Sequence, residues 1–279
     1  MSIQVKASFK KEFLAFFRTH TFLIITCVII GLAIFSPLLI AGMSAFMDAF
    51  SDVYDEMGMD VTDMTDFLVS SASTGMIFSI EAVTGTSLIV VLLLLNKVAG
   101  GEQKKRANII PMSAGLCSFA YIFPKFIIYP LTAFILSFGA VVASWPLCVW
   151  LFEANDVTIG GVMLAAALSA TGVMLFVCCH LALGTATGRA GMSAAICIGV
   201  SLLLPVVFAS VSLDYMFNPF AMGSLASTAV MSIEITNSFL ADNLISIAFA
   251  IGIMIITYLV ALFAQNARRI DNSGDEVEL

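Results

Sequence analysis

The sequence predicts an all-α polytopic membrane protein with six transmembrane helices. Of its 279 residues, 60% are hydrophobic and only 11% are charged, whereas soluble domains carry about 25% charged residues. The mean hydropathy is +1.05. Because a soluble fold needs charge over its surface, we infer that lipid surrounds most of this chain.

Apolar stretches long enough to cross a bilayer recur along the chain, since a spanning helix needs about 20 residues. They are 21–43, 75–96, 117–143, 159–183, 191–212 and 243–264. No segment between them is long enough for a separate soluble domain. The predicted organisation is therefore an N-terminal helix over 1–20, a six-span domain over 21–264 and a tail over 265–279.

The basic residues predict the orientation. All but one of the twelve Lys and Arg residues lie before the first span, between spans 2 and 3, between spans 4 and 5, or after the last span. Segments 44–74, 144–158 and 213–242 contain acids but no Lys or Arg. The positive-inside rule places both termini and the 97–116 segment in the cytoplasm, and the acidic segments outside.

The N-terminal segment has the pattern of an amphipathic helix lying in the cytoplasmic interface. Its apolar residues fall within about 120° of arc on a 3.6-residue helix, and they are Val5, Phe9, Phe13, Phe16 and Phe17. Lys11, Glu12 and Arg18 lie opposite, while Lys6 and Lys10 can snorkel at the edge. The residues expected to hold this helix at the interface are Lys10, Lys11, Phe13, Phe17 and Arg18. The alternative is a plain solvated start to the first span.

The outer segment around 48–66 is acidic. Phe46, Phe50, Tyr54 and Met57 recur there at helical spacing, which predicts short amphipathic helices that cap the outer side. The acids either attract cations or form a solvated face, and the D-x-D-x-D-G spacing of a calcium loop is absent.

Segment 213–242 is too polar to span and too apolar for a free loop, and Asn218-Pro219 breaks it near its start. We expect a re-entrant or outer-leaflet helical hairpin between spans 5 and 6, with protein or a water-filled cavity covering its backbone.

Patterns for catalysis or cofactor binding are missing. The glycine cluster at 184–191, GTATGRAG, lacks the G-x-x-x-x-G-K-[ST] order and predicts a tight turn. Cys178, Cys179 and His180 point about 100° apart on a helix, so we interpret them as a packed helix end and not as a metal site. We therefore expect a protein that is not an enzyme, binds no metal or cofactor itself and has no nucleic-acid partner.

Two charged residues lie inside predicted spans. Glu81 is about two turns into the second span from outside, and Lys125 is about two turns into the third from inside. Charge in hydrocarbon is costly, so such residues face a cavity, a partner or the nearest interface. An intramembrane role in transport and a structural or snorkelling role both remain open. Pairing between the two is not expected, because they enter from opposite faces.

Two stretches resemble the membrane subunits (permeases) of ABC-2 type exporters. KKEFLAFFRTHTFLI is similar to the interfacial connecting helix of that family, and EQKKRANIIPMSAGLCSFAYIFPKFI to its segment after the second span. The matching positions are Glu102, Pro111, Gly115, Leu116 and Lys125. Asn218-Pro219 resembles the proline break after the fifth span. The sequence departs from the family at Ala107-Asn108, where Gly-Thr is usual, and at Cys117-Ser118, where Ser-Arg is usual.

The resemblance implies that a cytoplasmic coupling helix between spans 2 and 3 docks on a separate ATPase subunit. Charged contacts are expected from Glu102, Lys104, Lys105 and Arg106, and an apolar anchor from Ile109, Ile110 and Met112. The implied assembly is a permease homodimer or heterodimer with two ATPase copies, which bind ATP and Mg, in a bacterial plasma membrane.

The expected function is export of a hydrophobic or amphipathic peptide, lipid or drug. The alternative is a secondary transporter or channel that works without an ATPase. Internal repeats and interrupted helices lined by polar residues would favour it.

Overall fold

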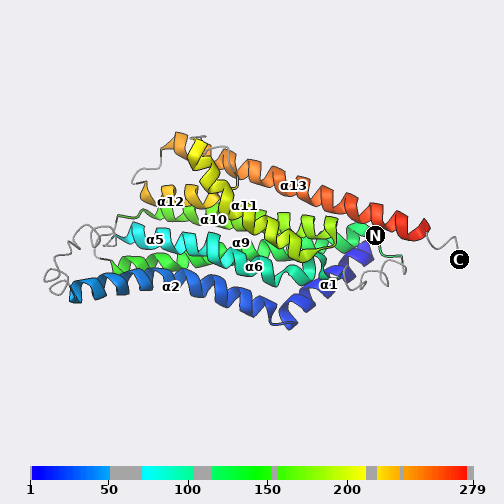
Figure 1. The fold of residues 1–279 in the computed structure, drawn as a ribbon, viewed down its shortest axis with the longest axis horizontal. Coiled ribbons are helices and arrows are strands. Elements are labelled where there is room, and N and C mark those ends of the chain that lie inside the picture. The colour runs from blue at the N-terminus through cyan, green and yellow to red at the C-terminus, as the bar shows by residue number, and fades with distance from the viewer. Residues whose placement is uncertain are drawn as a thin grey trace.

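The computed structural model describes residues 2–50, 71–102, 115–152, 156–211, 219–232 and 236–274. These parts form an elongated bundle of helices that run roughly along its long axis (Figure 1). The elements, with η for a π-helical segment, are α1 (Ser2–Arg18), α2 (Thr21–Ala49), α5 (Ala72–Glu81), η1 (Ala82–Ser87), α6 (Leu88–Leu94), η2 (Lys97–Gly101), α9 (Ser118–Leu151), α10 (Ile159–Thr187), α11 (Ala190–Val211), α12 (Met222–Met231) and α13 (Asn237–Gly274).

Within the described residues, 5 helical stretches are long and apolar enough to cross a membrane. They are Thr21–Met43, Ala72–Gly101, Ser118–Leu151, Ile159–Thr187 and Ser238–Ala267. The described part of the chain is therefore all-helical, and the protein is a multi-pass membrane protein, as predicted. The remaining predicted span corresponds to α11, in which the apolar stretch Ala190–Leu204 is shorter, so the count of six stays a prediction.

The second span contains two π-helical segments. The chain runs through α5, η1, α6 and η2 from Ala72 to Gly101. A π-helical turn contains one residue more than an α-helical turn, and such turns occur frequently at functional sites. This irregularity distinguishes the second span from α9 and α10, which are helical without such a segment.

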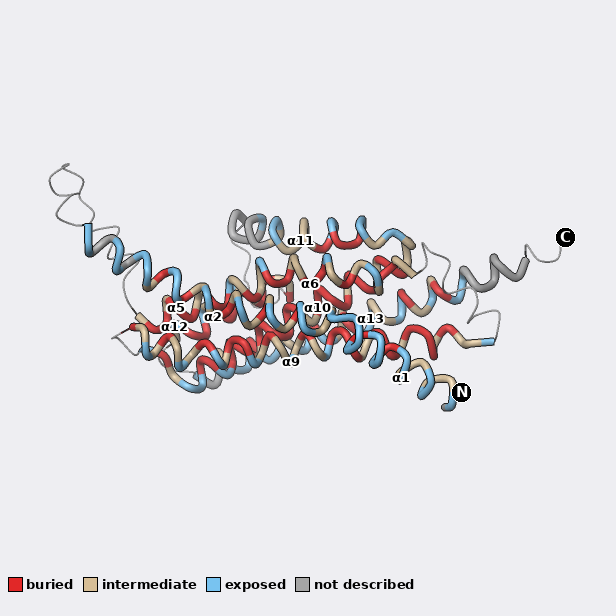
Figure 2. The backbone as a smooth tube through the Cα atoms, turned by 90° about the horizontal axis from the view of Figure 1, so that it is seen from below, coloured by how far each residue is buried: buried red, intermediate tan, exposed pale blue. Residues whose placement is uncertain are grey.

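Helix α10 lies in the middle of the bundle. It packs against α9, α11, α12 and α13, and Figure 2 shows the buried residues gathered along this central region. Small residues permit the close approach: a Cβ on Gly172 would lie 2.8 Å from Met222 Cβ, and one on Gly184 would lie 2.7 Å from the Ala99 carbonyl oxygen. Small residues in a membrane-spanning helix let neighbouring helices approach closely in this way.

The two ends of the bundle differ in what they hold. Helix α1, the C-terminal end of α13 and the turn between α10 and α11 lie at one end, called the α1 end (Figure 1). Gly188 closes α10 there with a φ of 67°, which confirms the tight turn predicted at 184–191. The end of α2, the start of α5 and α12 lie at the opposite end, called the α12 end. Which end faces the cytoplasm stays a prediction.

The predicted outer features lie at the α12 end and are described in part. Helix α12 is buried in the bundle along Ala226, Ala229 and Val230, but residues 212–218 and 233–235 lie outside the described residues, so the hairpin stays a prediction. Helix α2 continues to Ala49, beyond the predicted span end, and the rest of the predicted acidic cap, from 51 on, is outside the described residues.

Candidate functional site

A buried lysine organises the polar side chains of the α1 end. Lys125 of α9 is only 5% exposed. Its Nζ donates a hydrogen bond of 2.5 Å to Glu102 Oε2 and one of 3.0 Å to the Tyr121 hydroxyl. The Tyr121 hydroxyl in turn donates to Glu102 Oε2 at 2.7 Å. Glu102 follows η2 directly, so these bonds tie the end of the second span to α9.

A second carboxylate joins this group from α1. Glu12 is 4% exposed, and its Oε1 lies 4.0 Å from Lys125 Nζ. The Tyr129 hydroxyl donates to Glu12 Oε2 at 3.2 Å, and Lys11 Nζ lies 3.7 Å from Glu12 on the exposed side. We call Glu12, Glu102, Tyr121, Lys125 and Tyr129 the inner charge network. It connects α1, the second span and α9.

The network keeps Glu102 ionised at neutral pH. Burial by itself raises the pKa of this carboxyl, but the Lys125 ammonium and the hydrogen bonds from Lys125 and Tyr121 outweigh that effect. The net pKa of Glu102 therefore lies below its ordinary value of 4.5. The Glu102–Lys125 contact is consequently a charge-assisted pair, which is stronger than a hydrogen bond between neutral groups.

Sequence reasoning missed two tyrosines and one glutamate of this network. Tyr121, Lys125 and Tyr129 follow one another at four-residue spacing, which places them on one face of α9. That spacing is the signal that could have found the tyrosines. Lys125 is visible in the sequence as a charge inside a span, and it does not snorkel, because its ammonium lies within the protein.

The prediction that Glu12 lies on the solvated face of the N-terminal helix is wrong. Helix α1 turns Glu12 and Phe16 toward the bundle, and the Phe16 ring packs edge-on against Tyr129 at 5.0 Å. Phe13 and Phe17 are exposed instead. The physical reason is that Lys125 supplies a buried positive charge, so a carboxylate is the better neighbour at this position.

The other predicted interface residues of α1 are exposed. Lys10, Lys11 and Arg18 lie on its surface together with Phe13 and Phe17. An exposed set of aromatic and basic side chains suits contact with a lipid interface. The interfacial position of α1 nevertheless stays a prediction.

Most of the predicted coupling segment lies outside the described residues, including Lys104, Lys105, Arg106, Ile109, Ile110 and Met112. Its two flanks are described. Glu102 is held by the inner charge network, and the Gly115 carbonyl accepts a hydrogen bond of 3.2 Å from Gln4 Nε2. Helix α1 thus contacts the flank at Gly115 directly and the flank at Glu102 through Lys125.

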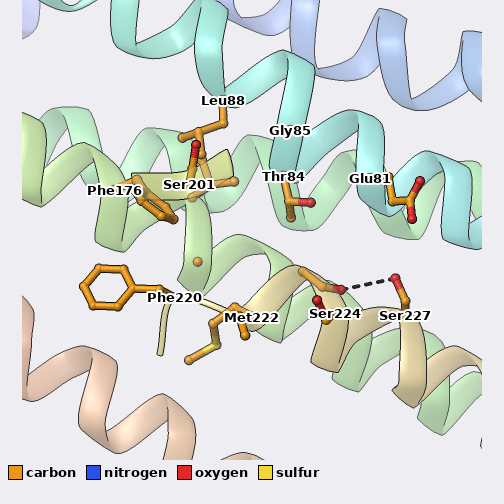
Figure 3. Close-up of a pocket in the computed structure, with 14 residues that line it drawn as sticks. Glu81, Thr84, Gly85, Leu88, Phe176, Ser201, Phe220, Met222, Ser224 and Ser227 are labelled. Carbon is orange, nitrogen blue, oxygen red and sulfur yellow. Dashed lines mark hydrogen bonds between the residues drawn. The ribbon is translucent and has the colours of Figure 1, made fainter. Parts of the chain in front are cut away.

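The second intramembrane charge, Glu81, lies elsewhere, at a cavity of about 250 Å³ near the α12 end (Figure 3). Glu81 and Thr84 extend from the second span toward α12, where Ser224 and Ser227 lie. Glu81 is exposed and has no ion-pair partner among the described residues. It does not pair with Lys125, in agreement with the prediction.

Apolar side chains form the other part of this cavity. Phe176 of α10 and Phe220 lie edge-to-face with centroids 5.7 Å apart, and Leu88, Val173 and Met222 also line the space. The cavity is therefore amphipathic: a carboxylate and several hydroxyls lie toward one end, and the aromatic rings lie toward the other, with the Ser201 hydroxyl beside them (Figure 3). Sequence reasoning found Glu81 but not its surroundings, which come from the second span, α10, α11, α12 and the residues just before α12.

Cys178, Cys179 and His180 contribute to helix packing. His180 is buried, and its Nδ1 lies 2.8 Å from the Ser193 hydroxyl at the contact between α10 and α11. Within the described parts of the chain, no three metal-binding side chains come together.

Two sites thus emerge from residues that the sequence singled out, one around Lys125 and one around Glu81. No protein-family model matches the chain, and no curated protein matches it.

Proposed function

We propose that this chain is the membrane-spanning permease subunit of an ATP-driven exporter of the ABC-2 type. It would work as a dimer in the bacterial plasma membrane, with both termini cytoplasmic and two copies of a separate ATPase that hydrolyse the ATP. The observation that carries the proposal is the inner charge network, in which Lys125 joins Glu102 to Glu12.

The network suits transmission of force from a cytoplasmic partner. Glu102 stands at the start of the proposed coupling helix and accepts hydrogen bonds from both Lys125 and Tyr121 of α9. Separating a buried ion pair is costly because each charge would be left uncompensated. A displacement of the coupling segment would therefore move α9 and α1 with it, and α9 continues to Leu151 at the α12 end.

An apolar groove supports a hydrophobic or amphipathic cargo. It has a volume of about 620 Å³ and lies between α9, α10 and α13, where Phe126, Met174 and Ile251 are among its lining residues. Thr171 and Tyr258 are its hydroxyl-bearing side chains. A site lined in this way binds apolar groups in preference to sugars or nucleotides.

Affinity purification from the native membrane tests the proposal. The wild-type protein should carry a second chain with ATP hydrolysis activity into the eluate. Arg106→Glu should lower that activity, because the charge reversal removes a charge-assisted contact with the ATPase. Arg189→Glu is the matched control, since this exposed residue lies in the turn between α10 and α11 at the α1 end. The proposal predicts no loss for the control.

An eluate without ATP hydrolysis from fully folded wild-type protein would contradict the proposal. So would equal activity in Arg106→Glu and the wild type together with unchanged export.

The second candidate function, a secondary transporter or channel, is favoured by the π-helical interruption beside the Glu81 cavity. Interrupted helices that line a polar site are typical of such transporters. Purified protein in vesicles without any ATPase separates the two candidates. Concentrative transport driven by an ion gradient alone would favour the second, and no transport under the same gradient would favour the first.

A further inference from the structure

We infer that the cavity at Glu81 is a binding site for an organic ammonium group. As a statement about the cargo it rests on the proposed function, but binding itself requires neither ATP nor an ATPase. The inference stands on the charge, the hydrogen-bonding capacity and the shape of the cavity.

The first step is the charge. Glu81 lies within the second span and has no cationic partner among the described residues, whereas Lys125 is held by Glu12 and Glu102. An ionisable side chain in a membrane span carries a high free-energy cost of desolvation, and it commonly marks a ligand or ion pathway. A cation bound in the cavity would supply the positive charge that no described residue places beside Glu81.

Three hydroxyls of the cavity are free to act as acceptors: Thr84 and Ser227 lie toward the Glu81 end, and Ser201 lies beside Phe176 (Figure 3). Thr84 donates its hydroxyl proton to the Ile80 carbonyl at 2.8 Å, and Ser201 donates to the Ile198 carbonyl at 2.9 Å. Ser227 likewise donates to a main-chain carbonyl, at 3.2 Å (Figure 3). Because a hydroxyl has one proton and two lone pairs, these groups present lone pairs to the cavity. Such a lining favours a cation over an anion.

The aromatic part of the cavity selects an organic cation. The Phe176 and Phe220 rings form one wall, and aromatic rings attract alkylammonium groups through cation–π contacts. The volume of about 250 Å³ is many times the roughly 10–15 Å³ that one water needs on the same measure. A bare alkali ion would not fill this space, whereas the organic substituents of an alkylammonium would occupy the part beside the aromatic rings.

Two glycines allow the helices that line the cavity to pack closely against one another. A Cβ on Gly223 would lie 2.9 Å from Thr84 Oγ1, so α12 rests directly on η1. On the other side α12 touches α10 at Gly172, as described above. The cavity is thus framed by the second span, α10, α11 and α12, and its polar groups are held on helices.

Equilibrium binding of radiolabelled choline to the purified chain in uncharged maltoside micelles tests the inference. Wild-type protein should bind choline saturably. Glu81→Gln keeps the shape of the side chain and removes its charge, so it should weaken binding about tenfold or more. Asp242→Asn is the matched control, because it removes one negative charge at the start of α13 without lining the cavity, and its binding should equal that of the wild type.

Three further arms sharpen the result. The uncharged isostere of choline, 3,3-dimethylbutanol, should not compete, because it lacks the positive charge. Phe220→Leu should weaken binding by a smaller factor than Glu81→Gln, through loss of the cation–π contact. Dihexanoylphosphatidylcholine distinguishes the source of the ammonium group: stronger competition than unlabelled choline indicates a lipid headgroup, and weaker competition indicates a free solute.

The inference would be overturned by absence of saturable choline binding, by equal affinity in Glu81→Gln and the wild type, or by competition from 3,3-dimethylbutanol as strong as that from choline. None of these results involves ATP hydrolysis. A negative binding result therefore contradicts only the ammonium site. Only the purification experiment with the ATPase can contradict the proposed role as an exporter subunit.

Discussion

Two carboxylates belong to the second span, Glu81 inside it and Glu102 directly after it, and they have opposite surroundings. Glu102 is paired with Lys125 and Tyr121 at the α1 end, whereas Glu81 faces a cavity near the α12 end. A separation of 21 residues corresponds to about 30 Å along a helix. One continuous helical stretch thus connects the proposed coupling segment with the proposed ligand cavity, and both π-helical segments lie between Glu81 and Glu102.

The difference shows how one membrane protein treats charge in two ways. At the inner charge network, protein groups satisfy the charges, so these residues stabilise the fold and hold three elements together. No described residue provides a counter-ion for Glu81. This arrangement is expected where a bound ligand supplies the positive charge. Removing a charge should therefore be severe at the first place and mild at the second.

The largest effect is expected from Lys125→Met. It leaves Glu12 and Glu102 close together without their shared cation, and breaking a buried pair in this way costs about 3–5 kcal/mol. Thermal and denaturant unfolding of the purified protein in micelles measures this loss.

Lys11→Met is the matched control for that substitution. Lys11 contacts Glu12 from an exposed position, at 3.7 Å, and an exposed pair contributes only about 0–1 kcal/mol. Equal losses for Lys11→Met and Lys125→Met would show that the network is not organised around Lys125.

A smaller loss is expected from Gly172→Ala. The added methyl group would lie 2.8 Å from Met222 Cβ, so α12 must shift away from α10, and overpacking of this kind costs about 1–3 kcal/mol. The same unfolding measurement applies, and choline binding should weaken with it because both helices line the cavity.

Gly139→Ala provides the comparison, because a Cβ there meets nothing within 4 Å. It should be neutral or slightly stabilising in the helix. If Gly172→Ala were equally neutral, the packing of α12 against α10 would be looser than described.

Glu102 should make stability depend on acid pH. Its folded pKa lies below the ordinary value of 4.5, so its ionised form stabilises the fold above pH 4.5, and this contribution is lost as the pH falls through the lower folded pKa. The difference in melting temperature between wild type and Glu102→Gln should therefore be largest at neutral pH and shrink below pH 4.5. A difference that stays constant into strong acid would contradict the pairing with Lys125.

The smallest effect on stability is expected from Glu81→Gln. An exposed residue without an ion pair among the described residues changes the free energy of unfolding by no more than about 0.5 kcal/mol when substituted. Melting temperature checks this value. A loss as large as that of Lys125→Met would mean that Glu81 is a structural residue, and the contrast between the two ends would disappear.

The five spans found among the described residues were predictable because hydropathy and length are properties of the sequence alone. The predicted stretch 75–96 lies within Ala72–Gly101, and 159–183 lies within Ile159–Thr187. The burial of Glu12 was not predictable in the same way. Helical periodicity places Glu12 among polar neighbours. Only the packing of α1 against α9 brings its carboxylate close to Lys125.

The sequence predicts one part of the Glu81 cavity, namely the carboxylate itself. A carboxylate in a span is visible in the sequence, so Glu81 was singled out. Its hydroxyl and aromatic neighbours, such as Ser201, Ser227 and Phe176, come from distant parts of the chain and meet only after tertiary packing. The π-helical segment η1 has no sequence signal comparable to a helix cap or a proline.

A double-mutant cycle in unfolding free energy tests the central contrast most directly. Lys125→Met is combined once with Glu102→Gln and once with Glu81→Gln. Residues in one ion-pair network show interaction energies of about 0.5–3 kcal/mol, whereas distant sites add within about 0.3–0.5 kcal/mol. The account predicts strong coupling for the first pair and additivity for the second. Additivity of Lys125 with Glu102, or coupling of Lys125 with Glu81, would contradict it.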